Sequence, residues 1–276
     1  MSLDETKVCR KRKLAELSQR ELERYSRHLI LPEIGQDGQK KLKAAKVLLV
    51  GAGGLGSPSA MYLAAAGVGN LGLIDDDVVE ENNLQRQIIH SVSALGKPKT
   101  DSARARILDI NPYIAVRVFN VRLSGSNAYN LFSGYDIVID CSDNYHTRYL
   151  INDACVLLGK PLVYGAVHRF EGQVTVFDTS RGGCLRCLFS EPPDIEFLKA
   201  NGEGGIFGVL PGIIGSIQAN EVIKLILDSG APLINRLLTV DSWRMRFYEI
   251  KLKKNRTCPL CGDARTITGL IPNCNP

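Results

Sequence analysis

The stretch Lys46–Gly56, which reads KVLLVGAGGLG, decides the fold. Its first half is a short apolar run of the kind that forms buried parallel strands. In its second half, Gly51, Gly53 and Gly56 fit the pattern G-x-G-x-x-G. Small residues from 57 to 66 follow and predict a helix. A strand, a glycine loop and a helix in this order are typical of nucleotide-binding α/β folds.

The glycine loop predicts a phosphate site, because glycine lets the backbone approach phosphate and a helix N-terminus offers free N–H groups. Asp75 ends the next predicted strand, where an acid accepts hydrogen bonds from a ribose hydroxyl. We add Gly54 and Asp77 to the residues expected to bind the nucleotide. These motifs alone do not select a reaction, and they equally fit an NAD-dependent oxidoreductase.

Predicted strands and helices alternate along the rest of the chain. Ser18 and Glu21 fit a capping box that opens a helix over 21–30. Further helices are expected at 97–109, up to residue 158 and at 212–227, with strands at 136–140, at 173–177 and near 237 and 246. This alternation predicts a parallel sheet with right-handed crossovers, and we treat residues 1–276 as one domain.

Composition excludes several classes of protein. An apolar fraction of 45% is that of a globular chain, and the formal charge of +5 gives no reason to expect nucleic-acid binding. No apolar run reaches the ~20 residues of a membrane span, and the N-terminus lacks the apolar core of a signal peptide. We expect a cytoplasmic protein that binds neither nucleic acid nor membrane.

Four of the eight cysteines form two C-x-x-C pairs. They are Cys184, Cys187, Cys258 and Cys261. Four thiolates make a closed tetrahedral zinc site, which would be structural because no position is left for water. A redox couple is the alternative interpretation of one such pair.

Three charged residues indicate a chemistry. Arg86 and Lys99 can neutralise phosphate, and Asp143 follows a predicted strand at the edge where ligands bind, as a magnesium ligand would. These groups suit attack of a carboxylate on the α-phosphate of ATP, in which two anions must approach each other. No general base is needed, because the nucleophile is already ionised at pH 7.

Several motifs occur in the order known from one family. They are RYSR from 24, GAGGLG, DDDVVEENNLQRQ from 75, GKPK from 96, DCSDN from 140 and EGQVTVF from 171. The chain resembles the MoeB/ThiF family of sulfur-carrier adenylyltransferases, in its MoeB/MoeZ branch, over about residues 18–262. The family implies a Rossmann-like, mostly parallel sheet that continues into antiparallel C-terminal strands. It also implies ATP, magnesium and zinc as cofactors.

The resemblance assigns roles to single residues. Asp75 would hold the ribose and Asp143 the magnesium. The phosphates would be held by Asn83, Arg86 and Lys99. Arg27 lies in an N-terminal helical region at 18–35. In a homodimer it would contact the ATP that the other chain binds.

The resemblance also implies partners. Residues 46–180 would bind the nucleotide, and residues 181–262 would hold zinc and dock a small ubiquitin-like carrier that ends in Gly-Gly. The tail 263–276 is similar to the linker before a rhodanese domain in longer relatives. An external rhodanese or desulfurase would therefore supply sulfur.

One position departs from the family pattern. Relatives carry a cysteine before the GVLPG-type segment, and Asn201 stands in that place. An amide is not a usable nucleophile, so we expect adenylation without an enzyme thioester.

Other functions stay open at this point. A tRNA threonylcarbamoyladenosine dehydratase shares the fold and the adenylation chemistry, and a non-catalytic scaffold would lack Arg86 or Asp143. The pathway is also open among molybdopterin, thiamin, tRNA thiolation and cysteine synthesis.

Overall fold

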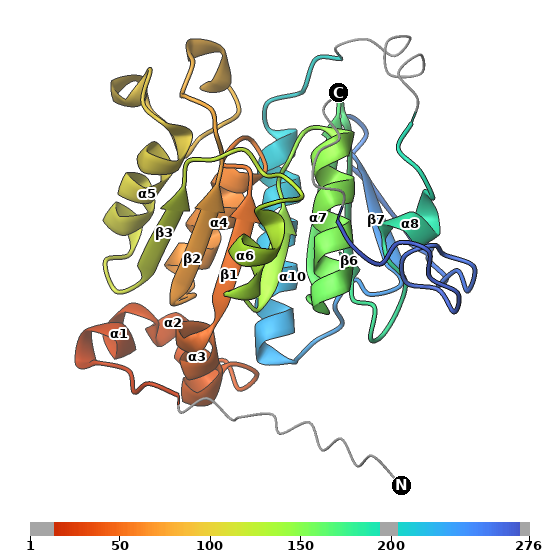
Figure 1. Ribbon diagram of the computed structural model, residues 1–276. Coiled ribbons are helices and arrows are strands. Elements are labelled where there is room, and N and C mark those ends of the chain that lie inside the picture. Colours follow the sequence, from red (N-terminus) through yellow and green to blue (C-terminus); the bar gives the residue numbers. More distant parts are fainter. Residues whose placement is uncertain (1–13, 194–203, 271–276) are drawn as a thin grey trace, which may run out of the picture.

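One twisted sheet runs through the computed structural model, which describes residues 14–193 and 204–270 (Figure 1). Five strands are parallel: β1 (Lys46–Val50), β2 (Asn70–Ile74), β3 (Ala115–Phe119), β4 (Ile137–Asp140) and β5 (Leu162–His168). Three follow antiparallel: β6 (Glu171–Phe177), β7 (Arg236–Asp241) and β8 (Arg246–Lys251). The spatial order β3-β2-β1-β4-β5-β6-β7-β8 confirms the predicted Rossmann-like fold with antiparallel C-terminal strands.

Helices cover both faces of this sheet (Figure 1). On one face lie α4 (Gly56–Ala65), α5 (Lys99–Ile110) and α10 (Leu210–Leu227). On the other lie α6 (Ala128–Ser133) and α7 (Tyr145–Leu158). Three further helices, α1 (Gln19–Arg24), α2 (Ser26–Leu29) and α3 (Gly35–Ala44), lie where β1 begins, and α8 (Leu185–Leu188) packs beside α7.

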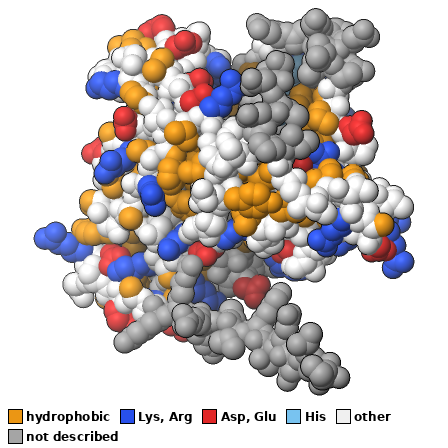
Figure 2. Space-filling view, viewed as in Figure 1, with side chains coloured by type: hydrophobic (Ala, Val, Ile, Leu, Met, Phe, Trp, Pro, Cys, Tyr) orange, Lys and Arg blue, Asp and Glu red, His pale blue; other side chains and the backbone are white. Residues whose placement is uncertain are grey.

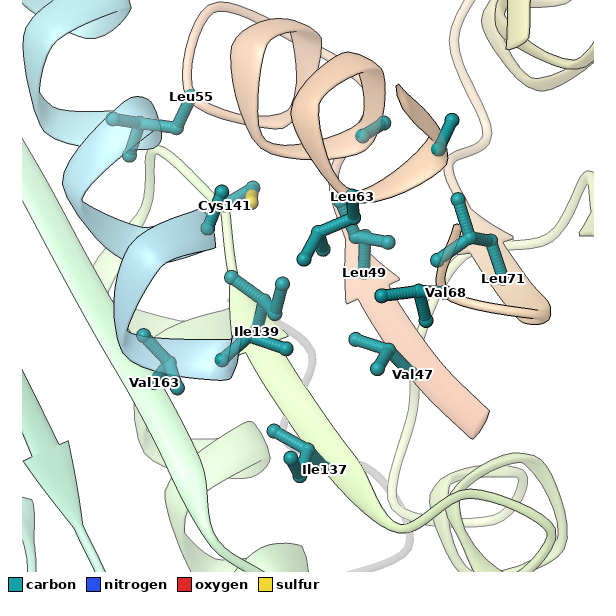
Figure 3. Packing of buried hydrophobic residues seen from close by; sticks show 14 of the residues in the cluster. Val47, Leu49, Leu55, Leu63, Val68, Leu71, Ile137, Ile139, Cys141 and Val163 are labelled. Atoms are coloured by element: carbon teal, nitrogen blue, oxygen red, sulfur yellow. The ribbon is translucent and has the colours of Figure 1, made fainter. Parts of the chain in front are cut away.

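Alternate residues of β1 enter two separate cores. Val47 and Leu49 belong to the cluster shared with α4 and α10, and Figure 3 shows Leu49 beside Leu63 and Val47 near Val68. Leu48 and Val50 belong to the cluster under α6 and α7. Side chains alternate between the faces of a strand, so a strand that is buried on both sides must be apolar throughout. This explains the uninterrupted run after Lys46.

The N-terminal helix differs from its prediction. Ser18 and Glu21 do form the expected capping box. The predicted helix at 21–30, however, is split into α1 and α2 at Tyr25. Tyr25 is buried and its hydroxyl accepts a hydrogen bond of 2.8 Å from Asn111 Nδ2. This tertiary contact fixes Tyr25 between the two helices.

Several elements had not been expected from the sequence, among them α3, β3 and α6. α3 contains two glycines, which disfavour a helix, and it is polar on average, so no apolar run marks it. β3 lies at an edge of the sheet and is only partly buried, so it lacks the apolar run of β1. α6 spans six residues, too few for an amphipathic repeat to be recognised.

Among the described residues, α10 is the one helix long and apolar enough to cross a membrane by length and composition. It packs against α4, β5 and β6, and its buried residues join the core. Its apolar character is therefore explained by its position against the sheet.

Candidate nucleotide site

A cavity of about 530 Å³ opens at the carboxyl ends of the parallel strands. Its walls come from the loop after β1, the end of β2 and the loop after β4. β1 and β4 are neighbours in the sheet, and the chain order reverses between them. Ligands bind at this kind of switch point in open α/β sheets, and the cavity has the size of a small-molecule site.

The glycine loop closes tightly against the loop after β4. Gly51 has φ +102°, and a Cβ atom there would lie 2.6 Å from the carbonyl oxygen of Cys141. A Cβ atom on Gly56 would overlap the carbonyl oxygen of Gly51. Gly53 and Gly54 line the cavity, and an added Cβ atom would have more space at Gly53 than at Gly54. The first and last glycines are needed for the turn, and the middle ones form the wall.

Asp75 holds the edge of the cavity together. Its two carboxylate oxygens accept hydrogen bonds from the backbone N–H groups of Ala52, at 2.7 Å, and Asp77, at 3.0 Å. Burial raises the pKa of Asp75 above that of an ordinary aspartate, and the two hydrogen bonds oppose this. Each oxygen keeps a second lone pair, so the carboxylate can also accept from a ligand hydroxyl.

Both predicted cations line the cavity. Lys99 is the first residue of α5 and is buried, with its ammonium nitrogen 2.8 Å from an oxygen of Asp77. Arg86 donates to the carbonyl oxygen of Asn82 at 3.0 Å. The site therefore places a fixed lysine and an arginine on the walls of one polar cavity.

Asp143 also lines the cavity, three residues beyond the buried end of β4. It is exposed, and its nearest polar contact is Asn144 Nδ2 at 3.5 Å. Asn144 in turn caps α7 by accepting from the backbone N–H of Thr147. An exposed carboxylate on such a fixed turn suits a hard cation.

Arg148, which sequence reasoning had not singled out, also lines the cavity. Arg148 is buried and donates to the carbonyl oxygens of Ser142, at 2.8 Å, and Gly165, at 2.6 Å. It also faces Asp140 at 3.7 Å. Burial raises the pKa of Asp140, and the charge of Arg148 opposes that effect. The DCSDN motif marked the Asp140 end of this pair, but its partner lies in the following helix.

His90 supports the glycine loop from behind. Its Nε2 lies 3.0 Å from the carbonyl oxygen of Ala52, and its Nδ1 lies 2.9 Å from Ser102 Oγ. A carbonyl oxygen only accepts, so Nε2 carries the proton and Nδ1 accepts from the serine. Burial lowers the pKa of His90, which keeps this neutral form. No sequence motif pointed to this residue.

Several predicted residues lie elsewhere. Asn83 does not line the cavity; its side chain accepts from the backbone N–H of Glu80 and donates to Asn82. Arg27 is exposed on α2, before the start of β1, whereas the cavity lies beyond the end of that strand. The chain thus does not bring Arg27 to its own cavity. Asn201 lies outside the described residues.

The four cysteines of the two C-x-x-C pairs come together as predicted. Their sulfur atoms all lie within 4.8 Å of one another. Cys184 Sγ is 3.7 Å from Cys258 Sγ, and Cys187 Sγ is 3.3 Å from Cys261 Sγ. Zinc–sulfur bonds of ~2.3 Å in a tetrahedron require sulfur separations of roughly 3.8 Å. The cluster is therefore compatible with a tetrahedral metal site.

The glycine loop yields a direct prediction. Gly51→Ala should lower the free energy of unfolding by about 1–3 kcal/mol, because its φ and its contact with Cys141 both oppose a side chain. Gly53→Ala should stay within about 0.5 kcal/mol, because its Cβ would meet only Gln87 Nε2 at 3.6 Å. Urea unfolding followed by fluorescence measures both. Equal effects of the two changes would contradict this account of the loop.

Comparison with known proteins agrees with the geometry. The model of the ThiF family matches residues 25–260. A sulfur carrier protein adenylyltransferase of Thermus thermophilus is 46% identical over 256 residues, which cover 91% of this chain and 94% of the relative. A SAMP-activating enzyme E1 of Haloferax volcanii is 47% identical and covers 88% and 90%.

Longer relatives match as well. A probable adenylyltransferase/sulfurtransferase MoeZ of Mycobacterium tuberculosis is 49% identical over 88% of this chain, which spans only 63% of that protein. Among solved structures, E. coli MccB crystallised with ATP has a TM-score of 0.76 at 26% identity, covering 87% of this chain and 73% of MccB. Since the family match and these relatives extend over most of the chain, the protein belongs to the ThiF family.

Proposed function

We propose that this chain uses ATP to adenylate the C-terminal carboxylate of a small ubiquitin-like sulfur-carrier protein, with release of pyrophosphate. The observation that carries the proposal is the meeting of Asp75, Arg86, Lys99 and Asp143 in one cavity at the switch point. The names of the Thermus, Haloferax and Mycobacterium relatives support the same chemistry.

Each residue has a task in this reaction. Asp75 accepts from the ribose and so positions the nucleotide against the glycine loop. Arg86 and Lys99 bind the phosphates and reduce the repulsion between them and the incoming carboxylate. The charge of the transition state then develops among fixed cations, which need no rearrangement when the reaction occurs.

Asp143 would hold magnesium, whose charge would further neutralise the phosphates. The residue fits this role because it is exposed at the cavity and is fixed by the capped start of α7. A nicotinamide oxidoreductase would have no use for this set of cations and carboxylate.

The carrier would bring its Gly-Gly tail into the cavity from the side of the antiparallel strands. The end of β8 and the segment after it offer exposed basic residues, among them Lys251, Lys253, Lys254 and Arg256. Figure 2 shows Lys and Arg side chains at the right edge of the view, where Figure 1 draws this segment. An acidic carrier surface would complement it.

A homodimer would explain how Arg27 could contact a bound nucleotide. This residue is exposed and cannot reach the cavity of its own chain, because the two lie at opposite ends of β1. In a two-fold dimer, Arg27 of one chain would reach the phosphates bound by the other. An external persulfide or sulfide would then attack the carbonyl carbon of the acyl-adenylate and displace AMP.

Carrier-dependent ATP–pyrophosphate exchange tests the proposal. Exchange should appear only with a carrier that ends in Gly-Gly, and Asp143→Asn should reduce it about 100-fold or more by weakening the metal. Asp109→Asn is the matched control, because Asp109 is an exposed aspartate in the last turn of α5. Undiminished exchange in Asp143→Asn would refute the metal assignment, and no exchange with any carrier would refute the function.

Asn201 leads to a second test. The chain, ATP and a carrier should give no thiol-sensitive conjugate on non-reducing gels, because an amide is not a nucleophile. Asn201→Cys supplies a thiol at the same position and serves as the comparison. A reducible, ATP-dependent conjugate of the natural chain would show that another group captures the carrier.

Zinc is proposed for the four-cysteine cluster. Metal analysis should find about one zinc per chain, and Cys258→Ser should lose the metal and unfold at a lower temperature. Cys155→Ser is the control, since Cys155 is buried but lies outside the cluster. A metal-free natural chain that is fully folded would exclude this role.

A further inference from the structure

Asp77 and Lys99 are held together by backbone as well as side-chain contacts. Lys99 N–H donates to the carbonyl oxygen of Asp77 at 2.9 Å, next to an antiparallel bridge between Val78 and Pro98. Val79 N–H donates to the carbonyl oxygen of Lys97, also at 2.9 Å. This short ribbon fixes the start of α5 against the end of β2, so the two side chains share one corner of the cavity.

The two partners of the ion pair differ sharply in exposure. The Lys99 side chain is 8% exposed, and that of Asp77 is 66% exposed. A buried ammonium needs a neighbouring anion, because without one the free-energy cost of removing the charge from water is not offset by any ion pair. An exposed carboxylate, in contrast, loses little when it moves from its partner into water. If a second anion approaches Lys99, the Asp77 carboxylate is therefore the group that moves away from the ammonium and into water.

We propose that Asp77 acts as an internal competitor for Lys99, which a bound anion must displace, and so makes the site selective for polyphosphate. This inference rests on the proposed function. A phosphate chain carries enough charge to replace Asp77 beside the ammonium, whereas a single carboxylate only matches it. Asp77 thus prevents Lys99 from pairing with the carboxylate of the carrier, which must instead lie next to the α-phosphate that it attacks. Asp77 accordingly acts on specificity through Lys99.

The inference separates Asp77 from its neighbour Asp76. Both lie in the same acidic run, both are exposed and both line the cavity. Their carboxylates lie within 4.8 Å of each other's, so they act on a bound anion through similar long-range repulsion. Among the described residues, only Asp77 of the two pairs with Lys99. Asp76→Asn is therefore a control with the same change of charge.

The test measures nucleotide affinity of the full chain by calorimetry, without magnesium, for the natural protein, Asp77→Asn and Asp76→Asn. Asp77→Asn should bind ATP about threefold to tenfold more tightly than Asp76→Asn does. Adenosine, which has no phosphate, should bind all three proteins alike. Circular dichroism checks that both variants fold. A repeat with magnesium shows whether Asp77 also binds the metal, which would appear as weaker ATP binding in Asp77→Asn.

The outcomes are distinct. Tighter ATP binding in Asp77→Asn alone, with unchanged adenosine binding, supports the competition. Equal ATP affinities of the two variants would overturn it and leave the proposed function intact, since only long-range charge would then act. Weaker ATP binding in Asp77→Asn, with or without magnesium, would also overturn it, because Asp77 would then be a ligand. A natural chain that binds no ATP would overturn both the inference and the proposed function.

Discussion

The carboxylate of Asp75 is the interaction on which the site depends. It accepts from Ala52 in the glycine loop and from Asp77 in the next turn, so it joins the ends of β1 and β2. Asp77 in turn contacts Lys99 through both backbone and side chain. One half-buried carboxylate therefore links the loop that would receive phosphate to the turn that pairs with the cation that would neutralise it. Its burial raises its pKa, and its two backbone donors help to keep it ionised.

Helix α7 links this site to the cysteine cluster. Its first turn stands beside Asp143, while Asn152 accepts from the backbone N–H of Leu185 at 2.9 Å. Asp153 pairs with Arg186 through two hydrogen bonds of 2.8 Å. Both contacts hold α8, the helix that begins after Cys184 and contains Cys187. A metal there would thus stabilise the far end of the helix that positions Asp143, without itself taking part in the chemistry.

Elements with a strong local pattern were predictable, and those that depend on long-range contacts were not. The run after Lys46 predicted β1 because both its faces are buried. The matching spacing of the cysteine pairs predicted the cluster, because four thiols at two such spacings suit one metal. In contrast, α3 is polar and contains two glycines, and β3 is only partly buried, so neither shows an apolar run. Arg148 and His90 escaped prediction because each contacts backbone carbonyl groups, which carry no sequence signal, besides one side chain that is distant along the sequence.

The sequence by itself determined the α/β class, the glycine loop, the main charged residues of the cavity and the composition of the cysteine cluster. These follow from local periodicity and spacing, which a linear chain displays directly. Only the tertiary structure decided that the Asn83 side chain hydrogen-bonds within its own turn, that Arg27 lies away from the cavity, and that Lys99 is paired with Asp77. The reason is physical: whether a polar side chain faces a ligand or a neighbour depends on burial and distance, and folding alone sets both.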